Sequence, residues 1–98
     1  MKTYYVYILK CSDNTYYTGI TSNLSKRLIE HKTGKHIESY TYSRRPLSLM
    51  FYADFTNVSL AIDSEKQIKK WSRAKKEALI NGDFDKLPNL AKKNFNKE

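Results

Sequence analysis

The stretch YYTGITSNLSKRL, residues 16–28, joins two tyrosines, a glycine, the start of a helix and a Lys-Arg pair. Gly19 is one of only three glycines in the chain, although Val or Ile would satisfy routine packing in a strand. A glycine inside a strand indicates either a β-bulge or the close approach of a ligand or another backbone. The residues around Gly19 are therefore the first place to look for function.

A β-hairpin is predicted around the start of this stretch. Tyr4–Lys10 (YYVYILK) is rich in aromatic and β-branched residues, residues 12–15 (SDNT) have turn chemistry, and Tyr16–Thr21 fits the returning strand. An odd-length connecting loop places Tyr7 and Tyr17 on the same face of the sheet. The strand glycine would then leave an uncovered patch of backbone beside Tyr17. Two core tyrosines at a bulge are the alternative interpretation.

The rest of the chain alternates between helix and strand patterns. After the hairpin we predict a helix over Leu24–Lys32 capped by Ser22 or Asn23, a polar loop over Thr33–Pro46 and a strand over Ser48–Phe55. A second helix should run from Thr56 or Asn57 to about Trp71, and a third should cover Ala74–Ile80. Residues 81–83 form a stop signal, and a last helix is predicted over Leu90–Lys93. The order β-β-α-β-α-α implies an α+β fold, with a small, mostly antiparallel three-stranded sheet flanked by helices.

Length and composition bound the class of protein. With 98 residues, the chain is expected to form a single domain, 1–98, with its core over about residues 4–90. Lys and Arg number 18 against 10 acids, a net charge of +8, so nucleic acid is the first partner to consider. The single cysteine, Cys11, excludes an intramolecular disulfide and a cysteine-cluster zinc site. Without a signal segment or a bilayer-length apolar run, we expect a cytoplasmic protein with no membrane partner.

The predicted second helix carries a carboxylate on its apolar side. Five apolar residues share one broad arc of that helix: Val58, Ala61, Ile62, Ile68 and Trp71. Glu65 falls inside the arc, and a carboxylate facing the body of a protein is costly unless it is paired or binds a metal. An ion pair with Lys69, four residues further on, is the structural explanation, and the helix alone favours it over metal binding.

The predicted first helix places Arg27 and His31 four residues apart, so both side chains lie on one stripe that borders Leu24 and Leu28. A guanidinium and an imidazole that project together can bind a phosphate group. A solvated helix edge, with the arginine lying over the sheet, is the alternative.

These features occur in an order that resembles the GIY-YIG nuclease family. The resemblance rests on YVYIL (5–9) at the GIY motif, YTG (17–19) at the YIG motif, TGITSNLSKRLIEH (18–31) at the strand-to-helix signature, and AIDSEKQIKKW (61–71) followed by RAKKEALI (73–80) at the segment with the metal-binding glutamate. It covers nearly the whole chain. It is strongest toward small stand-alone bacterial members, which are similar to the N-terminal nuclease domain of the excision-repair C subunit.

The resemblance implies hydrolysis of phosphodiester bonds in DNA with one divalent metal ion, Mg²⁺ or Mn²⁺, in DNA repair or recombination. Glu65 would be the only direct protein ligand of the metal, and Arg27 would clamp the phosphate. Tyr7 or Tyr17 would deprotonate or orient the attacking water, and His31 would position it or assist as a base. A free tyrosine titrates near 10, so this role requires nearby positive charge.

Further residues are predicted to contact the nucleic acid: Gly19, Arg44, Arg45, Lys69, Lys70 and Arg73. The glycine would let a DNA backbone or a water molecule come close to Tyr17. The two adjacent arginines share a loop with Tyr40 and Tyr42 that can stack on DNA, and an ordinary solvated loop is an equal alternative. The lysines and Arg73 belong to a basic helical region suited to salt-dependent phosphate binding. RNA stays open as the polymer.

Some positions depart from the family pattern. Tyr5 replaces the glycine of the first motif, and Ile20 replaces a lysine found in the repair enzyme. The late asparagine of the family has several candidates: Asn81, Asn89 and Asn94. The absence of an added recognition domain argues against sequence-specific cutting. A non-catalytic nucleic-acid-binding module with the same fold is the main alternative function, and a basic face that docks on another protein is a third.

Overall fold

The computed structural model describes residues 2–87. Its elements are β1 (Tyr4–Lys10), β2 (Tyr16–Thr21), α1 (Leu24–Thr33), the 3-10 turn η1 (Tyr42–Arg44), β3 (Ser48–Phe55), α2 (Val58–Lys69), α3 (Arg73–Asn81) and the 3-10 turn η2 (Phe84–Lys86). This order confirms the predicted α+β fold. The predicted last helix, Leu90–Lys93, lies outside the described residues.

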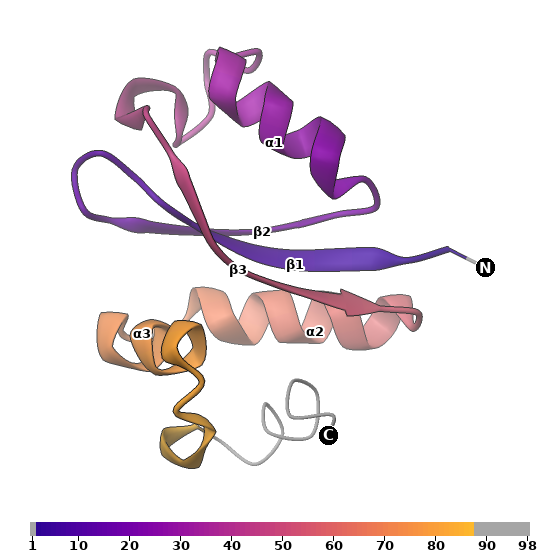
Figure 1. Ribbon diagram of the computed structural model, residues 1–98. Helices are drawn as coiled ribbons and strands as arrows, with labels where there is room; N and C mark the ends of the chain where they lie inside the picture. The colour runs from indigo at the N-terminus through magenta and orange to yellow at the C-terminus, as the bar shows by residue number, and fades with distance from the viewer. Residues whose placement is uncertain (1, 88–98) are drawn as a thin grey trace.

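The three strands form one antiparallel sheet in the order β2-β1-β3, so β1 is central. Helix α1 covers one face of this sheet, while α2 and α3 cover the other (Figure 1). The molecule therefore has three layers, and the two faces of β1 support two different environments. No helix within residues 2–87 is long and apolar enough to cross a membrane.

The helices begin and end where their local chemistry requires it. Each N-cap side chain, those of Asn23, Asn57 and Ser72, accepts a hydrogen bond from the backbone N–H three residues further on. Gly34 and Gly82 follow α1 and α3 at φ of 72° and 78°, a left-handed conformation that glycine adopts without steric cost. These caps fix the point at which α1 leaves β2, and hence where its side chains lie over the sheet.

The hydrophobic core lies between the sheet and α2–α3. Val6 and Ile8 of β1 pack there with apolar residues of the helices and of β3, among them Phe55, Ala61, Ile68, Ala78 and Leu79. Two members of the predicted apolar arc of α2 are outside this core, because Val58 and Ile62 are 42% and 39% exposed. The inward face of α2 instead follows the row of Ala61, Ser64, Glu65 and Ile68, all of which are buried.

The opposite face of β1 carries Tyr7, and the strand register explains the glycine in β2. Tyr7 pairs with Gly19 and Leu9 with Tyr17, which confirms that the two tyrosines share a face. A Cβ atom added to Gly19 would lie 2.5 Å from both Cζ and the hydroxyl oxygen of Tyr7. The Tyr7 ring therefore covers the glycine, and the prediction of an uncovered backbone patch beside Tyr17 is wrong.

Substituting Gly19→Ala should lower the free energy of unfolding by about 2 kcal/mol, because the methyl group displaces the Tyr7 ring from a packed site. Chemical denaturation of the two proteins measures this difference. In a Tyr7→Leu background the ring is absent, so the same substitution should cost much less. An equal cost in both backgrounds would contradict the packing of Tyr7 over Gly19.

Candidate active site

A chain of hydrogen bonds joins the sheet to α1 and to the loop that follows it. The Tyr7 hydroxyl lies 2.8 Å from His31 Nε2, and His31 Nδ1 lies 2.9 Å from Thr41 Oγ1. All three side chains are buried. Ser39 Oγ lies 2.9 Å from Thr41 Oγ1 and extends the chain toward the surface. A buried polar chain of this kind holds each group in one orientation.

The protonation of this chain follows from its electrostatics. Burial, followed by the nearby Arg27 charge, lowers the pKa of His31, so the imidazole is neutral at pH 7. Burial raises the pKa of Tyr7 to about 12, so the phenol keeps its proton. A protonated phenol donates to a neutral imidazole, which places the acceptor lone pair on Nε2. The remaining ring proton then lies on Nδ1 and is donated to Thr41.

Charged groups of the predicted site surround Tyr7. After burial, the nearby Tyr17 raises the pKa of Tyr7, while the charge and hydrogen bonding of Arg27 lower it. The Glu65 carboxylate has a smaller effect in the same direction and also raises the pKa of Tyr7. Helix α2, which carries Glu65, lies on the other side of the sheet from α1, which carries Arg27 and His31 (Figure 1).

Tyr17 lies at the centre of an aromatic cluster. Its ring centroid is 6.3 Å from that of Tyr7 and 5.5 Å from that of His31, in tilted and edge-on arrangements. On its other side, the ring of Tyr40 stacks at 6.1 Å with an interplanar angle of 21°. Such contacts stabilise aromatic pairs and restrict ring rotation. Tyr17 is only partly buried, so of the two candidate tyrosines it is the one that solvent reaches.

Arg27 lies at the rim of the site. Its side chain is 38% exposed, and its Nε lies 3.2 Å from Glu30 Oε1. Arg27 and His31 do share one side of α1, as their spacing predicts, but they differ in burial. The imidazole is inside the hydrogen-bonded chain, whereas the guanidinium reaches both Tyr7 and solvent.

Glu65 is 8% exposed, and its Oε2 lies 3.0 Å from Lys69 Nζ. The predicted ion pair between Glu65 and Lys69 is therefore confirmed. Within residues 2–87, no three His, Cys, Asp or Glu side chains come together as a metal cluster. A metal ion here would therefore take one carboxylate, with its other ligands from water and phosphate. Mg²⁺ accepts this arrangement, so the donor set fits a single-carboxylate site.

The loop after α1 is attached to the turn of the β1–β2 hairpin. Arg44 Nε lies 3.0 Å from Asp13 Oδ2, the Arg44 carbonyl accepts from Ser12 N–H, and the Tyr40 hydroxyl donates to Thr15 Oγ1. The Arg44 guanidinium also lies 3.8 Å from the centroid of the Tyr40 ring. Tyr40 is thus covered by Arg44 and stacked against Tyr17, so its ring is already engaged within the protein.

The other residues predicted to bind DNA are dispersed. Arg45 stacks on the Tyr42 ring at 4.5 Å and donates to the Tyr42 carbonyl. Arg73 pairs with Glu77, contacts the Asn14 carbonyl and lies over the Tyr16 ring. Lys70 is exposed at the end of α2. DNA contact by these side chains, by Arg44 and by the buried Gly19 stays a prediction.

Comparison with known proteins shows to which family the chain belongs. A model of the GIY-YIG catalytic domain matches residues 3–78. The chain belongs to the GIY-YIG family. A UPF0213 protein of Syntrophus aciditrophicus is 51% identical over 80 residues, which cover 82% of this chain and 92% of that protein. A UPF0213 protein of Natronomonas pharaonis is 44% identical over 77 residues, 79% of this chain and 89% of that one.

Two solution NMR structures resemble the fold. The UPF0213 protein of Bacillus halodurans is 38% identical, with a TM-score of 0.54 over 81% of this chain and 83% of that chain. A protein of E. faecalis is 29% identical, with a TM-score of 0.61 over 90% and 93% of the two chains. The matched family places the chain among nuclease domains.

Two buried threonines test the hydrogen-bonded chain. Thr41→Val should lower the free energy of unfolding by about 2 kcal/mol, because it leaves the buried His31 Nδ1–H without an acceptor.

The Oγ1 atom of Thr18 is also buried, without a hydrogen-bond partner in the described part of the chain. Thr18→Val should therefore raise the free energy of unfolding by about 1 kcal/mol. Equilibrium denaturation measures both changes in the free energy of unfolding. Changes of the same sign would contradict the assignment of a hydrogen bond between His31 and Thr41.

The buried imidazole should make stability depend on pH. The pKa of His31 is lower in the folded state than the unfolded value of about 6.5, so the unfolded chain takes up this proton first. The free energy of unfolding should fall as the pH drops below about 6.5. His31→Gln should flatten this slope between about pH 6.5 and pH 5, above the range where carboxylates titrate.

The exposed His36 provides the matched control, because His36→Gln also removes one imidazole. Denaturation curves of the three proteins, taken over this pH range, compare the slopes. A slope that His36→Gln flattens as much as His31→Gln would show that the buried imidazole is not its source.

Proposed function

We propose that this protein is a metal-dependent DNA endonuclease that hydrolyses phosphodiester bonds. The observation that carries the proposal is the 2.8 Å contact between the Tyr7 hydroxyl and His31 Nε2, within a cluster that also holds Tyr17 and Arg27. The contact brings a phenol and an imidazole together beside a guanidinium, and these groups can act on water and phosphate. Family membership supports the same chemistry.

The phenol–imidazole pair can remove a proton from water. With a pKa of about 12, Tyr7 alone supplies little phenolate at neutral pH. In the proposed step, the water proton passes to the Tyr7 oxygen while the Tyr7 proton passes to His31 Nε2. The imidazolium that results keeps its Nδ1–H hydrogen bond to Thr41. The hydroxide forms a new bond to phosphorus as the bond between phosphorus and the leaving sugar oxygen breaks, and that oxygen takes a proton from solvent. Because Tyr17 contacts solvent and both partners, it orients the water.

Arg27 controls access to the Tyr7 oxygen. In the free protein the guanidinium lies between Glu30 and the phenol. A substrate phosphate is a better partner for a guanidinium, since it offers charged oxygens in a matching geometry. When Arg27 turns to the phosphate, it neutralises developing charge and uncovers the Tyr7 oxygen for the attacking water.

Glu65 would hold the divalent metal, Mg²⁺ or Mn²⁺, in place of Lys69. The metal, when bound, would neutralise charge on the scissile phosphate and the leaving oxygen. Lys69 releases the carboxylate readily because its own side chain is 53% exposed and remains solvated without the pair. The positive charge of the chain, with Arg44, Arg45, Lys70 and Arg73 as candidate contacts, would attract the DNA backbone.

A binding module without turnover is the second candidate. The observation that favours it is the Lys69–Glu65 pair, which occupies one carboxylate oxygen of the predicted metal ligand. The replacement of a family lysine by Ile20 points the same way. The two functions differ in their need for a free Glu65 carboxylate and a divalent ion.

The decisive experiment is nicking of supercoiled plasmid at low salt with Mg²⁺ or Mn²⁺, and with EDTA as a control. Glu65→Gln should lower the cleavage rate by at least about 10³-fold, because the metal loses its carboxylate ligand. DNA affinity in a gel-shift assay should stay within about three-fold of wild type, since one carboxylate contributes little to phosphate binding.

The matched control is Asp63→Asn, an exposed carboxylate on the same helix, which should cleave like wild type. Binding without cleavage by wild type would favour the binding module. Equal cleavage by wild type and Glu65→Gln would contradict the assignment of the metal ligand.

A further inference from the structure

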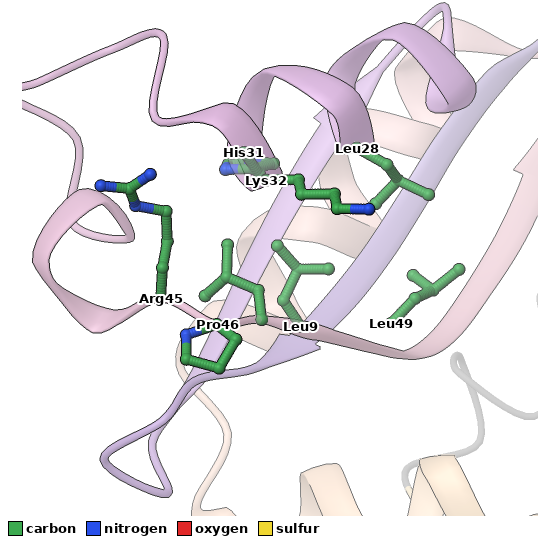
Figure 2. A pocket seen from close by; sticks show the side chains of 8 residues that line it. Leu9, Leu28, His31, Lys32, Arg45, Pro46 and Leu49 are labelled. Atoms are coloured by element: carbon green, nitrogen blue, oxygen red, sulfur yellow. The ribbon is translucent and has the colours of Figure 1, made fainter.

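A cavity of about 620 Å³ opens between α1 and the segment that leads into β3 (Figure 2). The residues that line it are Leu9, Leu28, His31, Lys32, Arg45, Pro46, Leu47 and Leu49. The volume is in the range of small-molecule sites in proteins. Neither Arg27, proposed to clamp the scissile phosphate, nor Glu65, proposed to hold the metal, lines this space, whereas Arg45, a candidate contact for the DNA backbone, does.

The lining combines an apolar floor with positive charge. Leu9 of β1 and Leu49 of β3 form the sheet side, and Leu28 of α1 faces them (Figure 2). The Lys32 side chain extends across the opening, and Arg45 stands at the opposite end (Figure 2). The stack on Tyr42 and the hydrogen bond to the Tyr42 carbonyl hold Arg45 in place. No acidic side chain lines the cavity.

One wall is His31, whose two ring nitrogens contact Tyr7 and Thr41. A ligand that reaches this wall would touch the imidazole that completes the phenol–imidazole pair. Any shift of this ring lengthens one of two buried hydrogen bonds, and leaving a buried polar group unpaired is costly. A ligand that displaces the ring would therefore change the geometry at Tyr7.

We propose that this cavity binds a small organic anion with an apolar body, a carboxylate or a phosphate ester, and that binding shifts His31. The leucine side chains would bury the apolar body, and Lys32, which extends across the opening, would bind the anionic group. The binding site and the movement of His31 do not depend on the proposed nuclease function. Only the consequence, a change in cleavage rate when the site is filled, rests on it.

The test uses NMR titrations of the full-length protein with two probes, hexanoate and phenyl phosphate. Either probe should give saturable shifts at the methyl groups of Leu28, Leu47 and Leu49 and at the His31 ring nitrogens. The probe that binds more tightly identifies the anionic group. Hexan-1-ol, which lacks the charge, should bind about five-fold more weakly. Inorganic phosphate, which lacks the apolar body, should leave the leucine methyl groups unshifted.

Two pairs of variants locate the site. Leu49→Glu should weaken binding by at least about ten-fold, because it removes apolar contact and repels an anion. Met50→Glu makes the same change at the next residue, which is 37% exposed and outside the cavity lining, and should bind as wild type. Lys32→Gln should weaken binding about five-fold, whereas Lys26→Gln, at an exposed position of α1 outside the lining, should not.

Several results would overturn the proposal. These are the absence of saturable binding by either probe, equal binding of hexan-1-ol, or equal effects of the two members of a variant pair. Binding that leaves the His31 ring nitrogens unshifted would refute the coupling to Tyr7. Because these readouts do not involve DNA cleavage, they hold whether or not the protein is a nuclease. If Leu49→Glu fails to fold, the comparison of Lys32→Gln with Lys26→Gln decides whether the probes bind in this cavity.

Discussion

The Tyr7 ring lies across Gly19, and this contact determines the rest of the site. It is possible only because β2 has no Cβ at that position, where one would meet the ring at 2.5 Å. From there the phenol reaches His31 Nε2 at 2.8 Å, and His31 in turn reaches Thr41. A single glycine in a strand thus connects the sheet, α1 and the following loop through one buried polar chain.

The two faces of β1 have different roles: one packs in the hydrophobic core, and the other carries the candidate site. Val6 and Ile8 face α2 and α3 and form the apolar core, whereas Tyr7 faces α1 and enters the polar chain. Because the core excludes α1, the active-site layer is free to hold buried polar groups and a cavity. Glu65 is the exception, since it is a buried carboxylate on the core-side helix α2 and its charge raises the pKa of Tyr7 on the other face of the sheet.

Local patterns predict the elements well and the site only in part. The bounds predicted for the three strands agree with β1, β2 and β3, since alternation and turn residues are local. The shared face of Tyr7 and Tyr17 follows from strand geometry alone. The sequence assigns Tyr40 to a loop that can stack on DNA, but it predicts neither the stacking of Tyr40 on Tyr17 nor the hydrogen bond of Thr41 with His31. Both contacts depend on a loop whose conformation is set by distant contacts with Asp13 and Thr15. Serine and threonine in a polar loop give no sequence pattern that would identify a histidine partner.

The attachment of this loop to the hairpin turn constrains how the chain can vary in length. Arg44 and Tyr40 bridge to Asp13 and Thr15, so two loops that are separate in sequence form one unit in space. Surface loops usually tolerate insertions. Here an added residue in either loop would shift Tyr40 against Tyr17 and disturb the site. The two loop lengths should therefore change together or not at all, although neither loop contributes a residue to the buried cluster between the sheet and α2–α3.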